Sequence, residues 1–357
     1  MKKSNVVNVV KVGAISLVVA LAYLPSGSVL AAGNQASVNQ SGSGNSASVD
    51  QTDQFNSNAS VTQTGDTNTA SVVQNEAGGT VAANLATISS SGTGNLASIT
   101  QTAANADSAS ISQTGDANTA SVSQTGGAGN SASISQTTAT GASAGVSQNG
   151  DTNTASVSQS GMFVGSTATV DQLGGGNNAS VIQSLGGVAT LASVSQAGVG
   201  NTASIRQDAV TDSSVSISQN GNANSATANQ TETANTVTVN QSGTANNANA
   251  NQSGTANSAA LIQSGTANVA TVTQSGTANN AAVTQTGTGN NASVNQSTAW
   301  NEAAIMQLAS ANVASINQSG MGTMALPNTA TITQSTSGNN ATIIQSGGAG
   351  NSATIHQ

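Results

Sequence analysis

The sequence predicts an all-β protein, a β-solenoid with two strands per coil and about 14 coils, which assembles into cross-β, amyloid-like fibres. Three observations predict it. One short motif recurs along most of the 357 residues, and polar and apolar residues alternate within each copy. Large side chains are also scarce, since aromatic residues make up only 1% of the chain. A thin, repetitive structure therefore fits this composition better than a globule with a deep core.

Charge and cysteine content exclude several kinds of function. The chain has a formal net charge of −8, and Arg206 is its only Lys or Arg beyond the first dozen residues. A chain this poor in cations does not neutralise phosphates, so we expect no nucleic-acid partner. It contains no Cys, so backbone pairing between repeats, and not disulfides, is expected to hold the fold.

Residues 1–32 have the pattern of a signal peptide. Three lysines in the first dozen residues precede the apolar stretch Val12–Leu24, and Ser28–Ala32 then supplies small residues, so cleavage is expected after one of its two alanines. The apolar stretch is shorter than a transmembrane helix requires. We therefore expect secretion, with no stable insertion in a membrane.

Residues 33–357 form one repeat region of about 28 strand units. Each unit contains the motif Ala-Ser/Thr-Val/Ile-x-Gln, as in Ala47–Gln51. Ala47, Val49 and Gln51 fall on one face of this segment and the residues between them on the other, a period of two that predicts a half-buried strand. Turns that contain Gly and Asn, such as Gln63–Asn68, join the units. Two strands with their turns make one coil of roughly 22 to 23 residues.

The spacing of the repeats slips near residues 136–148, where we interpret the pattern as one extra unit. Before the slip, spacings of 11 residues between successive Gln residues alternate with longer ones, and after Gln230 the spacing is almost uniformly 11. We expect tight turns to gather at one corner of the coil and variable loops at the other. The slip leaves a kink and a subdomain boundary as open alternatives.

Recurring Gln and Asn residues predict ladders of side-chain amides. They fall at the borders of the inward-facing Ala and Val positions, where each amide can donate to the equivalent amide of the next coil. A slip of one residue would turn every Gln and Val outward, so the ladders also specify register. The residues expected in these ladders are Gln40, Asn45, Gln51, Gln63, Asn68, Gln74, Gln113, Asn118, Gln124, Gln219, Asn224, Gln230, Gln345 and Gln357.

A longer pattern recurs across neighbouring units. The spacing Ser-x5-Gln-x-Gly-x-Gly-Asn-x-Ala-x3-Gln is followed, apart from Thr67 at the second Gly, by Ser57, Gln63, Gly65, Asn68, Ala70 and Gln74. This pattern resembles the repeat of curlin, the subunit family of bacterial curli fibres. The resemblance implies a secreted subunit of a Gram-negative bacterium that adds to an extracellular fibre on the cell surface and supports adhesion and the biofilm matrix. It also implies that the partners are other copies of the chain, a nucleator subunit and outer-membrane export machinery.

Asp66, Asp116 and Asp151 occupy equivalent turn positions in the pattern Gly-Asp-x-Asn. One carboxylate per turn is poor ligation for calcium, and Asp is common in turns for conformational reasons. Besides calcium binding and turn conformation, a third hypothesis is that these residues are gatekeepers, whose like charges slow premature assembly.

The sequence carries no signature of catalysis, and we expect neither an enzyme nor a cofactor. His356 is the only His, which excludes a catalytic triad and a His-based metal site. The principal rival is a monomeric solenoid that binds a surface such as ice, for which Thr271–Thr273 and Thr331–Thr333 supply only isolated Thr-x-Thr pairs. A minor nucleator subunit of the same fibre is a second alternative.

Overall fold

The computed structural model describes residues 6–11, 16–19, 33–52, 56–75, 83–161, 164–185 and 188–357. The chain divides into two compact units, unit 1 (Met1–Ala179) and unit 2 (Ser180–Gln357). The boundary falls within the strand β15 (Asn178–Ser184). The described residues are strands and turns, and they include no helix long and apolar enough to cross a membrane.

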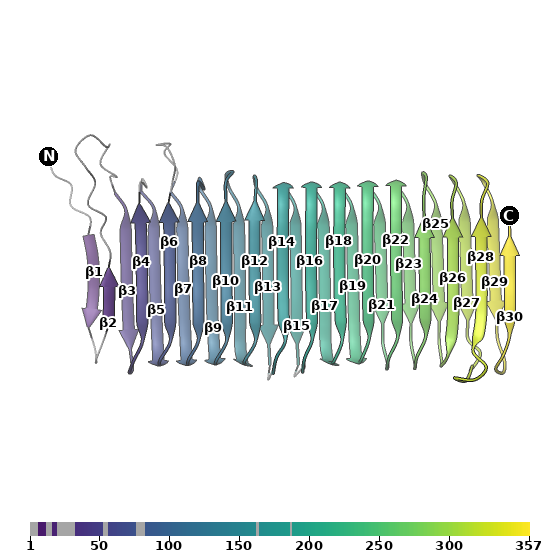
Figure 1. The fold of residues 1–357 in the computed structure, drawn as a ribbon, viewed down its shortest axis with the longest axis horizontal. Helices are drawn as coiled ribbons and strands as arrows, with labels where there is room; N and C mark the ends of the chain where they lie inside the picture. Colours follow the sequence, from purple (N-terminus) through teal and green to yellow (C-terminus); the bar gives the residue numbers. More distant parts are fainter. Residues whose placement is uncertain are drawn as a thin grey trace. The chain divides into compact units, whose positions relative to one another are not determined.

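The strands of unit 1 are short and regularly spaced (Figure 1). They are β1 (Val6–Lys11), β2 (Ser16–Val19), β3 (Gln35–Ser41), β4 (Ser46–Thr52), β5 (Asn58–Asp66), β6 (Thr69–Asn75), β7 (Leu85–Thr93), β8 (Leu96–Thr102), β9 (Ser108–Asp116), β10 (Thr119–Thr125), β11 (Ser131–Thr140), β12 (Ser143–Asn149), β13 (Thr154–Ser160) and β14 (Thr167–Gly175).

The strands of unit 2 continue the same pattern. They are β16 (Leu191–Val199), β17 (Thr202–Thr211), β18 (Ser214–Asn222), β19 (Ser225–Thr233), β20 (Thr236–Thr244), β21 (Asn247–Gln252), β22 (Ser258–Thr266), β23 (Val269–Gln274), β24 (Asn280–Gln285), β25 (Asn291–Gln296), β26 (Asn301–Gln307), β27 (Val313–Gln318), β28 (Asn328–Gln334), β29 (Asn340–Gln345) and β30 (Ser352–His356).

Odd-numbered and even-numbered strands form separate parallel sheets in each unit. In unit 1 the odd sheet runs β1-β3-β5-β7-β9-β11-β13 and the even sheet runs from β2 to β14, and unit 2 repeats this order from β17 to β29 and from β16 to β30. Each strand therefore pairs with the strand one coil away, as Val122 of β10 does with Val146 of β12. The chain alternates between the two sheets, and the predicted two-strands-per-coil solenoid is confirmed. The coils number about 13, close to the expected 14.

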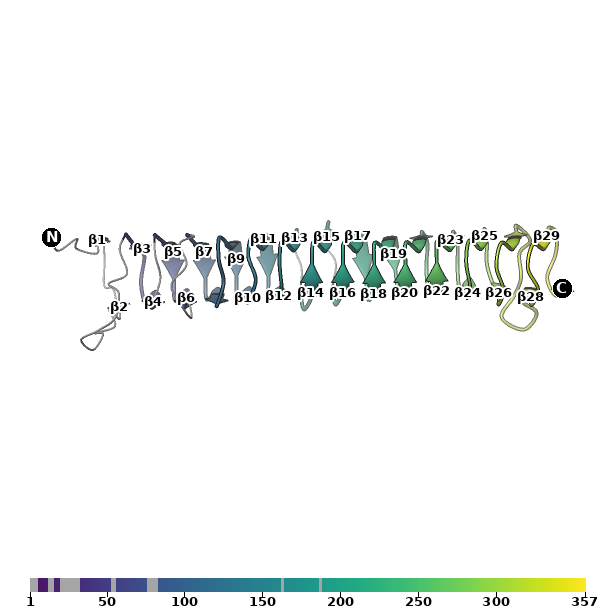
Figure 2. The same cartoon turned by 90° about the horizontal axis from the view of Figure 1, so that it is seen from above.

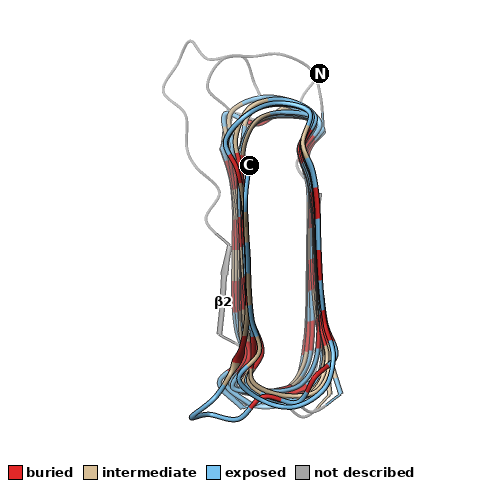
Figure 3. Ribbon diagram, turned by 90° about the vertical axis from the view of Figure 1, so that its right-hand side faces the viewer, coloured by how far each residue is buried: buried red, intermediate tan, exposed pale blue. Residues whose placement is uncertain are grey.

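The core of each unit lies between its two sheets, and the buried residues, red in Figure 3, recur along the strands of both. Alternate residues of the strands from β4 to β29 point inward, so Ala120 and Val122 are buried whereas Ser121 between them is exposed. The largest fully buried side chains include Ile88, Ile99 and Ile111 in unit 1. Small Ala and β-branched Val and Ile side chains let the facing sheets approach closely and suit the pleated backbone. The alternation predicted from the sequence is thus the pattern of burial.

The tight turns require Gly where adjacent coils stack. Gly115 has φ +121°, and a Cβ atom there would lie 2.0 Å from the carbonyl oxygen of Ala139 in the next coil. Other turn residues reach positive φ without being Gly, including Thr67 at 56° and Ala117 at 55°. A left-handed conformation strains these residues, because their Cβ atoms crowd the backbone.

The segment 136–148 keeps the alternation of the sheets. β11 pairs with β9 and β13 in the odd sheet, with a register shift between Thr137 and Ala139, and β12 continues the even sheet. The shift is a local bulge that absorbs an additional residue. The tight turn, however, lies at a different corner of the coil before and after this segment. The 11-residue spacing from Gln113 to Gln124 joins an odd strand to an even strand, whereas that from Gln148 to Gln159 joins an even strand to an odd one.

The first strands pair with the repeat region through their backbones. β1 lies parallel to β3 with Lys11 opposite Gln40, and β2 lies parallel to β4 with Val19 opposite Val49. The expected cleavage positions of the signal peptide, Ala31 and Ala32, lie outside the described residues. In unit 2 the longest connection, between β27 and β28, projects beside the strands in the view of Figure 2.

Candidate assembly site: amide ladders, turn carboxylates and end strands

The Gln residues of successive coils are joined by side-chain hydrogen bonds. Nε2 of each Gln donates toward the C-terminal coil, as Gln40 does to Oε1 of Gln63 at 2.6 Å and Gln113 to Oε1 of Gln136 at 3.0 Å. The same direction holds for the pairs Gln51–Gln74, Gln124–Gln148, Gln219–Gln241, Gln230–Gln252, Gln318–Gln345 and Gln334–Gln357. These chains of bonds, the Gln ladders, place amide acceptors toward the N-terminus and amide donors toward the C-terminus.

The Gln amides also link the two sheets. Nε2 of Gln63 in β5 donates to the carbonyl of Ser46 in β4 at 3.1 Å, and Nε2 of Gln101 in β8, which donates to Gln124 in its own ladder, also donates to the carbonyl of Leu85 in β7 at 3.2 Å. A Gln side chain is long enough to reach both partners and carries two donors and an acceptor. This cross-sheet bond was not inferred from the sequence. It explains the choice of Gln, because Glu has no donors and Asn is one methylene shorter.

The Asn residues form a different kind of ladder. The backbone N–H of Asn68 donates to Oδ1 of Asn45 at 2.9 Å, and Nδ2 of Asn68 donates to the carbonyl of Gly92 in the next coil at 2.9 Å. Asn224 likewise donates its N–H to Oδ1 of Asn201 at 3.0 Å. The Asn ladders therefore hold the turns of adjacent coils together through backbone partners, in addition to side-chain partners.

Several rungs carry other residues. Ser90 stands in a Gln ladder and donates its Oγ hydrogen to Oε1 of Gln113 at 3.2 Å. In one Asn ladder Ala142 takes the position after Asn118, and its backbone N–H donates to Oδ1 of Asn118 at 3.1 Å. Asp107 occupies another Asn position and is almost fully buried. Its place six residues before Gln113, like that of Asn45 before Gln51, is the signal from which the sequence could have revealed it.

The three turn aspartates accept hydrogen bonds from the preceding coil. A carboxylate oxygen of Asp66 accepts from the N–H of Ser43 at 2.8 Å and from its hydroxyl, and these bonds lower the pKa of Asp66. Asp116 accepts from the N–H of Thr93 at 2.9 Å, and Asp151 from that of Ala128 at 2.8 Å.

The turn aspartates do not share one corner. Asp66 and Asp116 follow odd strands, whereas Asp151 follows the even strand β12, so it lies at the opposite corner of the coil. No group of three or more acidic or His side chains suited to a metal ion occurs in the described part of the chain.

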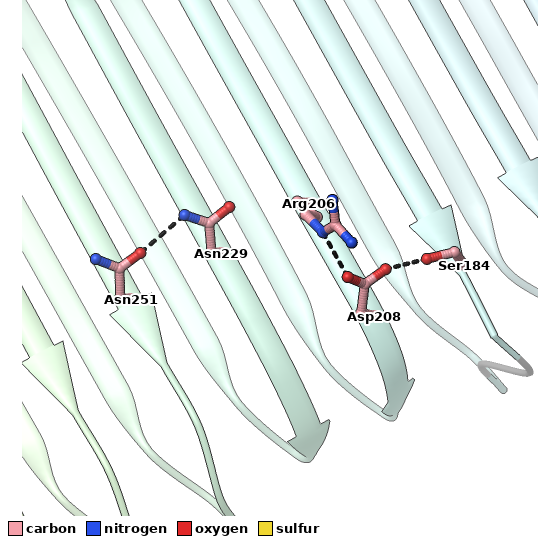
Figure 4. A network of polar contacts seen from close by, with 5 residues as sticks. All are labelled: Ser184, Arg206, Asp208, Asn229 and Asn251. Carbon is pink, nitrogen blue, oxygen red and sulfur yellow. Dashed lines mark hydrogen bonds and ion pairs between the residues drawn. The ribbon is translucent and has the colours of Figure 1, made fainter.

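The outer face of the odd sheet in unit 2 carries a small polar network (Figure 4). Arg206 pairs with Asp208, whose other carboxylate oxygen accepts from the hydroxyl of Ser184. Beside them, Nδ2 of Asn229 donates to Oδ1 of Asn251 at 2.8 Å. The Ser184–Asp208 and Asn229–Asn251 bonds join neighbouring coils on this partly exposed face, whereas Arg206 and Asp208 pair within one strand, where an ion pair contributes little stability.

The ends of the repeat region carry groups that have no described partner. At the C-terminal side, β29 pairs with β27 and β30 with β28, and no described strand pairs with their outer edges. At the N-terminal side, Oε1 of Gln40 is buried yet accepts no hydrogen bond within the described residues. The outer edges of β29 and β30 thus present a row of backbone groups that can template another strand.

Comparison with known proteins identifies the repeat. The curlin-associated repeat matches residues 104–137, 243–276, 265–297 and 328–357. Among curated proteins, none matches the chain. The matched segments cover strands of both units, and they include the ladder residues Gln113, Asn118, Gln124 and Gln345.

Proposed function

Because the curlin-associated repeat matches four segments of the chain, we propose that the protein is the structural subunit of an extracellular, curli-type amyloid fibre that grows by stacking coil on coil. The subunit is secreted by a Gram-negative cell, loses residues 1–32, passes the outer membrane through export machinery, and adds to a fibre begun by a nucleator. The fibre supports adhesion and the biofilm matrix. The subunit itself has a structural role and no catalytic one.

The single observation that carries this proposal is the common direction of the Gln ladders. Along the described coils the Gln–Gln bonds donate toward the C-terminal side, as from Gln318 to Gln345 and from Gln334 to Gln357. The last coil then offers amide donors, because Nε2 of Gln345 uses one proton on the carbonyl of Thr329 and has a second. The first coil of the repeat region offers the opposite group, the buried acceptor Oε1 of Gln40.

The Asn ladders support the same end-to-end match with reversed roles. The N–H of Asn351 donates back to Oδ1 of Asn328 at 3.0 Å, so Oδ1 of Asn351 is placed to accept from a following coil. Donors thus meet acceptors when the C-terminal coil of one copy stacks on β3 and β4 of another. Two identical ends would oppose donor to donor, which leaves buried amides unpaired at a cost of ~1–3 kcal/mol each. The repeated contact does not close on itself, so it generates a fibre.

The N-terminal strands β1 and β2 control whether the edges of β3 and β4 can pair with another copy. In the full chain β1 and β2 occupy the edges of β3 and β4. Removal of residues 1–32 frees both edges for the last coil of another copy. We therefore expect the chain that begins at Gly33 to assemble faster than the full chain.

The first experiment is assembly of residues 33–357 diluted from denaturant, followed by dye binding, seeding and fibre diffraction. Fibres that seed their own growth, with reflections at ~4.7 Å and ~10 Å, are expected. Replacing Gln345 and Gln357 by Met should slow elongation from wild-type seeds. Ile344→Met, on the exposed face of the same strand, is the matched control and should not. A soluble, β-rich monomer that never seeds would overturn the proposal.

The rival ice-binding function receives no support from the outer faces. Thr271 is aligned with Asn249 on one side and with Ser293 on the other, so its Thr-x-Thr pair does not extend into a row of threonines. The nucleator alternative differs from the main subunit in behaviour only. A nucleator would accelerate assembly of a partner chain more than its own.

A further inference from the structure

Asp107 is an ionisable residue inside an otherwise uncharged ladder. It is 1% exposed and occupies the Asn ladder between Asn84 and Asn130. Its N–H donates to Oδ1 of Asn84 at 3.0 Å, and its Oδ1 accepts from the N–H of Asn130 at 2.8 Å, as Oδ1 of Asn130 does from the N–H of Asn153. The difference lies at the second side-chain atom, where an amide has a donor and a carboxylate has an acceptor.

The second side-chain atom normally donates to a turn carbonyl. Nδ2 of Asn84 donates to the carbonyl of Ala104 at 3.0 Å, and Nδ2 of Asn130 to that of Gly150 at 2.6 Å. Each acceptor lies twenty residues after the Asn, so the equivalent carbonyl for Asp107 belongs to Gly127. Oδ2 of Asp107 accepts from Nδ2 of Asn130 at 3.3 Å. A neutral carboxyl group can in addition donate one proton toward the turn carbonyl, as the Asn rungs do, whereas a carboxylate has no proton to donate.

Hydrogen bonds from Asn130 stabilise a negative charge on Asp107, but no cationic side chain compensates it. Between Lys11 and Arg206 the sequence has no Lys, Arg or His, so the repeat region of unit 1 lacks any cationic side chain. The charged group that acts on Asp107 is another carboxylate, Asp151. Burial is the main cause that raises the pKa of Asp107, opposed by hydrogen bonds from Asn130 and Gly129. Geometry and electrostatics therefore both favour the neutral form.

We infer that Asp107 is an acid-operated rung, whose protonation completes the Asn ladder and stabilises the surrounding coils of unit 1. A raised pKa means that the folded chain holds this proton over a pH range in which the unfolded chain has lost it. Stability from this group is therefore highest below the ordinary pKa of 3.8 and falls as the pH rises through the raised value. For a chain that assembles as proposed above, acid conditions would then favour growth, and neutral conditions would delay it.

The test compares the wild-type chain with Asp107→Asn and Asp171→Asn. Asn is the residue of the other rungs, so the first variant should fold, and Asp171 is an exposed aspartate on the outer face of β14 that matches the loss of charge. The measurement is the urea midpoint of the β-sheet circular dichroism signal at pH 4, 5, 6 and 7. It needs no fibre, so it is independent of the proposed function.

The wild type and Asp171→Asn should lose stability together as the pH rises from 4 to 7, and Asp107→Asn should not. One unit of pKa difference corresponds to about tenfold in the folding equilibrium constant, so the size of the fall reports the shift. Hydrogen exchange should place the effect in β9 and β11. An Asp107→Asn chain that keeps the full pH dependence, or an Asp171→Asn chain that loses it equally, would overturn the inference.

Discussion

Nε2 of Gln113 in β9 donates to Oε1 of Gln136 in β11 at 3.0 Å, and both side chains are almost fully buried. The two residues are 23 positions apart, which is one coil of the solenoid. Gln136 passes the chain of bonds on to Gln159 at 2.8 Å and also donates to the carbonyl of Thr119 in the facing sheet. One side chain thus joins three coils of one sheet and connects that sheet to the other.

Replacing Gln136 by Met tests the contribution of a ladder rung. Met has a similar volume, but it leaves the amide donor of Gln113 without an acceptor in a buried site. We expect the free energy of unfolding to fall by about 2 kcal/mol, the usual cost of an unpaired buried polar group. Ser133→Met, on the exposed face of the same strand, should change it by less than ~0.5 kcal/mol. Urea unfolding measures the free energy of unfolding of both variants. An equal loss in the two would show that the ladder hydrogen bonds contribute no stability of their own.

Gly115→Ala tests the close approach of stacked turns. The new Cβ atom would lie 2.0 Å from the carbonyl oxygen of Ala139, so the turns must separate. We expect a loss of more than ~3 kcal/mol, above the ~1–2 kcal/mol of a left-handed conformation alone. Gly141→Ala is the matched control, because Gly141 also has positive φ but a Cβ atom added there would meet nothing within 4 Å. Similar losses in the two variants would mean that backbone conformation, and not contact, makes Gly necessary.

Ala245→Gly, Ala256→Gly and Ala267→Gly should stabilise unit 2. These turn residues have φ of 56°, 59° and 54°, where Ala is strained and Gly is not. Gly costs more entropy on folding, so we expect a net gain of roughly 0.5 kcal/mol at each position. The change returns the turn to the Gly-x-Gly-Asn form of the curlin repeat. Thermal unfolding measures the gain, and the buried Ala248→Gly should lower stability instead. A triple variant less stable than the wild type would contradict the strain argument.

The gatekeeper hypothesis for Asp66, Asp116 and Asp151 remains a prediction with a sharper test. Asn at each position keeps an oxygen that can accept the N–H of Ser43, Thr93 or Ala128, so the turns should persist while three charges disappear. We expect a shorter lag before assembly at neutral pH, because like-charge repulsion between subunits decreases. Dye-binding kinetics measure the lag at low and at high salt. A lag that is unchanged or longer at low salt would count against the hypothesis.

The local structure and the length of the coil follow from the sequence alone. The alternation in Asn45–Gln51 and the return of Gln after 11 or 12 residues depend only on neighbours along the chain, and period two together with Gly-containing turns leaves little choice of element. The all-β class, the parallel coils and the inward positions of Ala and Val followed from these patterns.

The contacts of each rung depend on the three-dimensional arrangement of the coils. The bond from Gln63 to Ser46 joins two sheets, the bulge near Thr137 moves the tight turn to the other corner, and Asp107 becomes a buried carboxyl. Each of these depends on which turn and which strand are stacked above and below. A spacing along the sequence does not contain that information, because hydrogen-bond partners and desolvation arise between residues of facing or stacked strands, 17 positions apart for Ser46 and Gln63 and 22 for Gln241 and Gln263.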